Sequence, residues 1–139
     1  MTAYLDSSVV LRRVLGQAGA LREWRLVRTS VSSRLTELEC LRTLDRLRLE
    51  GSLDERKLAA ARETTYSILA AFEIVELTRA ILTRAAQPSP TSLGSLDAIH
   101  LASALTWRER TGGGLVMATH DDALAIGARA FGMRAIGAS

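Results

Sequence analysis

The chain has 139 residues, of which 47% are hydrophobic and 24% charged, and its formal net charge at pH 7 is +3. These values are ordinary for a soluble globular protein, and the length is most simply that of one domain, spanning residues 1–139. No apolar run approaches the ~18 residues of a membrane span, no signal-peptide pattern opens the chain, and the lone Cys40 excludes an internal disulfide. We therefore expect a cytoplasmic protein with no membrane partner.

The basic side chains are almost all arginine, since Lys57 is the only lysine, and they are densest between Arg12 and Arg34. Arginine binds phosphate bidentately, so this excess is one expected footprint of a nucleic-acid-binding protein. Genomic base composition and solvated helix faces explain it equally well, because the net excess of positive charge is small. Composition alone leaves both interpretations open.

The apolar pattern of the first half predicts short strands and longer helices. Leucines recur every three residues from Leu35 to Leu47, close to the helical period, and a break at Gly51 ends that helix. Asp54 opens a second helix, so the two form a predicted helical hairpin over residues 34–70. In order, the predicted elements are a strand at 2–5, helices at 9–15 and 19–25, a strand at 26–31, and helices at 32–50 and 54–69.

The second half continues this alternation. Thr78 is a predicted helix cap, both prolines fall in a loop over residues 87–94, and the glycines at 112–114 end a strong helix. In order, the predicted elements are a strand at 72–77, a helix after Thr78, a helix at 96–110, a strand at 115–118, a helix at 121–131 and a strand at 133–136. Alternation of this kind is typical of an α/β protein with a parallel sheet covered by helices on both faces.

Four acids stand out by their positions in this pattern. Asp6 follows the first strand and Asp121 follows the strand at 115–118, while Glu39 and Asp97 lie near the starts of two helices. In a parallel sheet the carboxyl ends of the strands and the following helix starts share one edge. Carboxylates gathered there repel one another and raise each other's pKa unless a cation joins them, and hard oxygen ligands suit Mg²⁺ or Mn²⁺. The sequence therefore predicts a metal-dependent site.

Two of the acids also have simpler interpretations. Asp6 stands where a helix N-cap is expected, and taken alone this is the favoured interpretation. Asp97 lies in a first helical turn, where the helix dipole favours acids.

Two further assignments have neighbouring alternatives. Glu37 and Glu39 lie roughly 200° apart around a helix, so at most one points into a shared site, and Glu39 has a possible surface partner in Arg42. Thr119 with Asp122 resembles a capping box, which makes Asp122 the structural acid and leaves Asp121 free for the site.

Two other classes of protein compete with a metal-dependent enzyme. A non-catalytic binding module would use the acids only as helix caps. A phosphotransfer protein on a doubly wound α/β fold would need a second acid at position 8, where Ser8 stands, or a lysine after a late strand, whereas Lys57 lies in the helical hairpin. His100 follows Asp97 by three residues and is more simply a satisfied helix residue than a catalytic base.

Residues 4–8, 35–44, 96–102 and 118–122 together resemble the four sequence signatures of PIN domains, and the likeness is closest to VapC-type toxins of toxin–antitoxin pairs. The resemblance implies a three-layer α/β/α sandwich around a parallel sheet and a Mg²⁺- or Mn²⁺-dependent endoribonuclease. It implies that an acidic quartet binds the metal and carries the chemistry, with Ser7, Thr119 and Asp122 beside it. The quartet would be Asp6, Glu39, Asp97 and Asp121.

The same resemblance implies partners. An RNA substrate, a homodimer and a cognate VapB-type antitoxin are expected, with a segment of the antitoxin in the active-site groove and the helical hairpin as its grip. The expected chemistry is attack on the phosphodiester by a metal-activated water, without a covalent enzyme intermediate.

Overall fold

The computed structural model describes residues 1–138, and its centre is a parallel sheet of five strands in the order β3-β2-β1-β4-β5. The central strand is the first in the chain, as its entirely buried apolar run predicts. The strands are β1 (Thr2–Leu5), β2 (Thr29–Ser33), β3 (Glu73–Val75), β4 (Val116–Ala118) and β5 (Ala135–Ile136).

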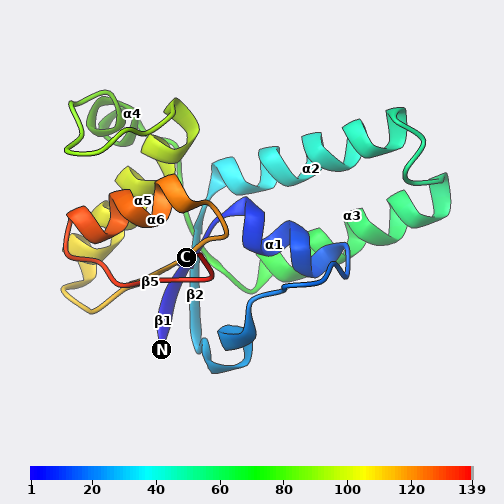
Figure 1. The fold of residues 1–139 in the computed structure, drawn as a ribbon, viewed down its shortest axis with the longest axis horizontal. Helices are drawn as coiled ribbons and strands as arrows, with labels where there is room; N and C mark the ends of the chain where they lie inside the picture. The colour runs from blue at the N-terminus through cyan, green and yellow to red at the C-terminus, as the bar shows by residue number, and fades with distance from the viewer. Residues whose placement is uncertain (139) are drawn as a thin grey trace.

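Helices cover both faces of this sheet, and Figure 1 shows α1, α2 and α3 on one side and α4, α5 and α6 on the other. The predicted three-layer α/β/α sandwich is therefore confirmed. No helix within residues 1–138 is long and apolar enough to cross a membrane. The helices are α1 (Ser7–Val14), the 3₁₀ helix η1 (Arg22–Leu26), α2 (Arg34–Leu49), α3 (Glu55–Ala70), α4 (Arg79–Ala85), α5 (Ser95–Thr111) and α6 (Asp122–Ala130).

Side chains on the two faces of β1 belong to two separate hydrophobic clusters, because successive side chains of a strand point to opposite faces. Ala3 and Leu5 pack with Val9, Val10 and other side chains on the side of α1 to α3. Tyr4 points to the opposite side, into the cluster formed with α4, α5 and α6. The sheet therefore lies between two hydrophobic cores, and the side chain of Tyr4, with its hydroxyl, lies in the core formed with α4, α5 and α6.

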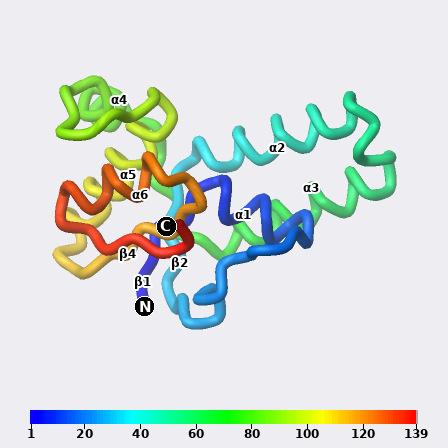
Figure 2. The backbone as a smooth tube through the Cα atoms, viewed as in Figure 1, coloured from blue at the N-terminus to red at the C-terminus, as the bar shows by residue number. Residues whose placement is uncertain are grey.

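The predicted helical hairpin is confirmed as α2 and α3, which project together from the sheet in Figures 1 and 2. Gly51 makes the turn between them with a φ of 80°, a left-handed conformation that glycine adopts without strain. Asp54 then caps α3 by accepting a hydrogen bond of 2.8 Å from the backbone N–H of Lys57.

The region before α2 differs from the prediction. The short helix expected at 19–25 is the 3₁₀ helix η1, and the strand expected at 26–31 lies instead at Thr29–Ser33. Of the two serines expected to open the helix, Ser32 belongs to the strand, whereas Ser33 ends the strand and also opens α2 as its N-cap, as expected. The Ser32 hydroxyl donates to the Leu5 carbonyl at 2.6 Å, and Ser33 is extended and accepts from the N–H of Leu35.

Successive strands are added to the sheet on opposite sides of the boundary between β1 and β4. From β1 the chain passes through α1 to β2 on one side, and from β4 it passes through α6 to β5 on the other. Leu5 and Ala118 are paired at the carboxyl ends of these two neighbouring strands. Ligands of open parallel sheets bind at such a switch point, because the chain diverges there and leaves a crevice.

Candidate active site

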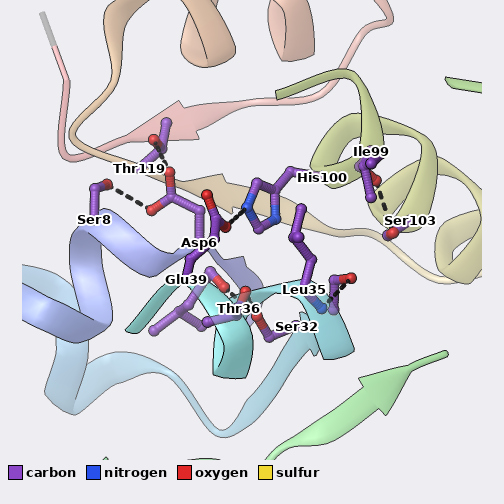
Figure 3. A network of polar contacts seen from close by, with 12 residues as sticks. Asp6, Ser8, Ser32, Leu35, Thr36, Glu39, Ile99, His100, Ser103 and Thr119 are labelled. Carbon is purple, nitrogen blue, oxygen red and sulfur yellow. Dashed lines mark hydrogen bonds and ion pairs between the residues drawn. The ribbon is translucent and has the colours of Figure 1, made fainter. Parts of the chain in front are cut away.

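Asp6 lies at the base of the site, directly after β1, with only 3% of its surface exposed. Its Oδ1 accepts hydrogen bonds from the Ser8 hydroxyl at 2.6 Å and from the N–H of Val9 at 3.2 Å, and its Oδ2 accepts from the Thr119 hydroxyl at 2.5 Å (Figure 3). The second of these bonds makes Asp6 the N-cap of α1, as expected. Three donors stabilise a buried carboxylate that would otherwise be costly.

Thr119 links Asp6 to Asp121 across the ends of β1 and β4. Its hydroxyl donates to Asp6 and accepts from the backbone N–H of Asp121 at 2.9 Å. Asp121 is exposed and caps α6, since its Oδ1 accepts from the N–H of Leu124 at 3.0 Å. The predicted capping box was therefore wrong: α6 begins at Asp122, so the residue before it, Asp121, is the cap.

Glu39 and Glu37 point to different partners, as their spacing on α2 requires. Glu39 Oε1 lies 2.5 Å from His100 Nε2, so His100 on α5 and not Arg42 is its partner. Glu37 forms a surface ion pair of 3.0 Å with Arg34. Of the two candidates, Glu39 is therefore the one that turns toward α5 and the other acids.

The sequence did not identify His100 and Tyr4 as a pair that supports Glu39. The His100 ring is 2% exposed, and its Nδ1 lies 2.7 Å from the hydroxyl of Tyr4, which is fully buried. The two rings meet edge to face at 5.8 Å. The available signal was positional: Tyr4 lies two residues before Asp6 on a buried strand, and His100 lies one helical turn after Asp97.

Asp97 is the least supported of the four acids. Within residues 1–138 its carboxylate has no hydrogen-bond partner, and it lies half-buried in the first turn of α5. The pKa of Asp97 is raised to about 6, mainly by burial and next by the charge of Asp121, against an opposing effect of His100. Asp6 and Glu39 add smaller contributions in the same upward direction. The other three carboxylates are thus close enough to repel that of Asp97.

Of the residues predicted to support the acids, Thr119 contacts Asp6 and Ser7 does not donate to it. Thr119 contacts Asp6 as described, whereas Ser8 rather than Ser7 donates to Asp6, and the Ser8 hydroxyl also accepts from the backbone N–H of His120 at 2.9 Å. Ser8 is therefore a contact that the sequence analysis missed. Asp122 begins α6, on the exposed side of that helix start.

The chemistry of these donors fits a divalent cation. All four are carboxylates, and none of the ion pairs formed within residues 1–138 brings an arginine or lysine onto them. Hard, negatively charged oxygens without a basic partner are the ligands that Mg²⁺ and Mn²⁺ prefer. As the side chains stand, however, no three Asp, Glu, His or Cys residues of the described chain are arranged to hold one ion. Binding would require the carboxylates to turn.

Comparison with known proteins supports the same architecture. The model of the PIN domain family matches residues 3–128. Ribonuclease VapC46 of Mycobacterium tuberculosis is 32% identical over 140 residues, which cover 98% of this chain and 97% of that protein.

Solved structures share the fold at low identity. A toxin–antitoxin complex from Klebsiella pneumoniae has a TM-score of 0.64 at 18% identity, covering 99% of this chain and 96% of that one. PAE2754 from Pyrobaculum aerophilum has a TM-score of 0.65 at 20% identity, covering 98% and 84%. VapBC2 from Rickettsia felis, bound to a DNA fragment from its promoter, has a TM-score of 0.65 at 10% identity, covering 97% of each chain. With the family model spanning most of its length, the chain belongs to the PIN domain family and is similar within it to VapC-type proteins.

Proposed function

We propose that this protein is a metal-dependent endoribonuclease and the toxin of a toxin–antitoxin pair. The observation that carries the proposal is the group of mutually repelling carboxylates at the switch point of the sheet, which raises the pKa of Asp97 to about 6 through burial and the charge of Asp121. A carboxylate whose pKa is raised in this way, with no arginine or lysine paired to it within residues 1–138, is typical of a functional site. The similarity to Ribonuclease VapC46 supports RNA as the substrate.

Asp6, Asp97 and Asp121 would hold Mg²⁺ or Mn²⁺, with Glu39 beside them on the rim. The bound cation supplies an electrophile that acidifies water and polarises the scissile phosphate. Asp6 is held by three donors and is the fixed point of the set. Asp97 has no such partner and is free to turn toward the cation.

Hydrolysis then needs a water molecule in line with the leaving oxygen. The water oxygen forms a bond to phosphorus while the bond from phosphorus to the 3′ oxygen breaks, which leaves a 5′-phosphate and a 3′-hydroxyl. A carboxylate takes the proton of the attacking water, and solvent returns a proton to the 3′ oxygen. Glu39, on the rim of the set with its side chain 21% exposed, is suited to contact that water.

RNA binding would rely on the arginines for the phosphate backbone, so affinity should fall with salt. Single-stranded or looped RNA fits better than a duplex, because its backbone can bend toward the buried Asp6. We further propose that the protein acts in the cytoplasm as a homodimer and is neutralised by a VapB-type antitoxin that contacts the α2–α3 hairpin. Its structural neighbours include VapBC complexes, which supports such a partner.

Cleavage of total cellular RNA tests the proposal. The purified protein is incubated with Mg²⁺ or Mn²⁺ beside Asp97→Asn, an EDTA control, and Asp45→Asn, a matched exchange of a surface acid paired with Arg48. We expect discrete fragments with 5′-phosphates from the parent and Asp45→Asn, and none from Asp97→Asn or with EDTA. Equal cleavage by folded Asp97→Asn would refute it.

A non-catalytic binding module is the second candidate, because Asp6 and Asp121 each cap a helix and so have a structural role. Thermal unfolding separates the two candidates without RNA. A cation bound by the native state must raise the unfolding temperature, whereas acids that serve only as caps give no response to Mg²⁺ or Mn²⁺.

A further inference from the structure

A chain of hydrogen bonds runs from the core to the rim of the acidic site. The fully buried hydroxyl of Tyr4 on β1 lies 2.7 Å from His100 Nδ1, and His100 Nε2 lies 2.5 Å from Glu39 Oε1. Figure 3 shows His100 reaching Glu39 from α5, while Ser8 and Thr119 reach Asp6 from other elements. Two of the acids are thus held by different sets of donors.

The direction of these hydrogen bonds follows from the chemistry of the three groups. Burial, together with the charges of Asp6 and Glu39, raises the pKa of Tyr4 well above its ordinary value, so the phenol keeps its proton. The Tyr4 hydroxyl therefore has a proton to donate to Nδ1 of His100. The ring proton then lies on Nε2 and is donated to the Glu39 carboxylate, which has only lone pairs to offer.

The ring is the fixed member of this chain, and Glu39 is the member that it orients. Tyr4 and His100 are enclosed in the core and pack edge to face, so neither can turn without opening it. The Glu39 side chain is 21% exposed and has room to move. Glu37, two residues earlier on α2, has no such buried donor and pairs with the exposed Arg34.

We propose that Tyr4 and His100 are positioning residues for Glu39, and that Glu39 directs the attacking water through Oε2 instead of holding the metal ion. His100 fixes Glu39 through Oε1, and Oε2 makes no hydrogen bond within residues 1–138, so Oε2 is the oxygen left to accept a hydrogen bond from the attacking water. The inference about water rests on the proposed nuclease function.

Binding of Mn²⁺, measured by calorimetry without RNA, tests the role of Glu39. We expect Asp97→Asn to raise the Kd by roughly 100-fold or more and Glu39→Gln to raise it by less than about tenfold, while Tyr4→Phe and His100→Gln leave it within about threefold of the parent. A loss of affinity in Glu39→Gln equal to that in Asp97→Asn would make Glu39 a metal ligand and overturn the water-directing role.

Cleavage kinetics at saturating Mn²⁺ test the positioning role. We expect kcat to fall by about 10- to 100-fold in His100→Gln and by about threefold to tenfold in Tyr4→Phe, with KM unchanged. Tyr66→Phe is the matched control, because it removes the hydroxyl of an exposed tyrosine whose one hydrogen bond within residues 1–138 comes from Arg62 on the same helix. Tyr4→Phe keeps the packing of the core, so an unchanged kcat in this variant would overturn the positioning role even if His100→Gln does not fold.

Nitrogen NMR of the His100 ring decides the hydrogen-bond chain without metal or substrate. The parent should show a protonated Nε2 and an unprotonated Nδ1, and Tyr4→Phe should shift the Nδ1 signal while Tyr66→Phe does not. A ring protonated only on Nδ1 could not donate to Glu39 and would refute the positioning. If the parent neither binds Mn²⁺ nor cleaves RNA, the water-directing role falls with the proposed function, and the NMR result still decides the positioning.

Discussion

On the side of the site formed by β1 and β4, Asp6 and Asp121 serve the fold as well as the site, because each caps the helix that follows it. On the side formed by α2 and α5, Glu39 and Asp97 cap nothing. Glu39 is held by one histidine, and Asp97 makes no hydrogen bond within residues 1–138. The first pair is explained by local structure alone, whereas the second pair is not.

Of these acids, the ones that cap no helix carry the information about function. A capping carboxylate would be retained in a protein with no chemistry to perform, because it satisfies free N–H groups of a helix. Asp97 instead raises the free energy of the native state, since its pKa is shifted up to about 6 by burial and by Asp121. The helix dipole at the start of α5 is the local gain of Asp97, and a residue whose burial costs stability beyond such a gain is typical of a functional site.

The largest expected effect is on stability at the first pair. Asp6→Ala leaves the hydroxyls of Ser8 and Thr119 and the N–H of Val9 without their acceptor in a buried site. We expect a loss of about 2–4 kcal/mol in the free energy of unfolding, measured by urea denaturation. Asp54→Ala removes an exposed cap from α3 and should cost only about 1 kcal/mol. Equal losses would show that the Asp6 network adds nothing beyond a cap.

The response to a divalent cation should depend on the second pair. At a Mn²⁺ concentration of about 100 times the Kd, binding to the native state adds about 2.7 kcal/mol to its stability. We expect a clear rise in unfolding temperature for the parent protein and for Asp45→Asn, and a much smaller one for Asp97→Asn. A rise that survives in Asp97→Asn would place the cation elsewhere.

Without metal, Asp97→Asn should stabilise the protein. The pKa of Asp97 is about 6 in the native state against an ordinary 3.8, so the native state binds the proton more tightly than the unfolded chain. The resulting penalty is absent below pH 4, grows between pH 4 and 6, and is complete above pH 6. Removing the charge should gain about 1–2 kcal/mol at pH 7.5, after allowance for partial exposure, and nothing near pH 4.

Denaturation of the parent and Asp97→Asn in EDTA at both pH values measures this difference directly. Asp45→Asn is the control, since Asp45 is paired with Arg48 on the surface of α2. A gain of the same size at pH 4 and pH 7.5 would mean that the substitution acts through packing or helix propensity and not through the charge.

The sequence predicted the α/β layers and the helical hairpin because those depend on local periodicity, as the leucines of α2 illustrate. It misplaced β2 because Ser32 was expected to open the helix, whereas its hydroxyl donates to the Leu5 carbonyl; Ser33 does open α2, since its hydroxyl accepts from the N–H of Leu35. The first of these bonds joins segments 27 positions apart, which local pattern does not encode.

The same distinction between local patterns and long-range contacts applies to the candidate site. Asp6 and Asp121 were locatable because each follows a strand and precedes a helix, although the capping role was assigned to Asp122 instead of Asp121. The contact of His100 with Glu39 joins residues 61 positions apart, and that of Tyr4 with His100 joins residues 96 apart. Such contacts depend on how helices pack across the sheet, so a histidine that supports the site looked like an ordinary helix residue.

The smallest expected effect is at Glu37, which tests whether Glu39 alone belongs to the site. Glu37→Gln removes one partner of a surface ion pair with Arg34 and should change stability by less than about 0.5 kcal/mol. Because Glu37 turns away from α5, RNA cleavage and Mn²⁺ affinity should equal those of the parent, while Glu39→Gln, the same chemical change two residues along α2, should lower kcat strongly. If Glu37→Gln lowers kcat as much as Glu39→Gln does, the two acids act together at the rim. Contact with His100 would then not be what separates a functional glutamate from a surface one.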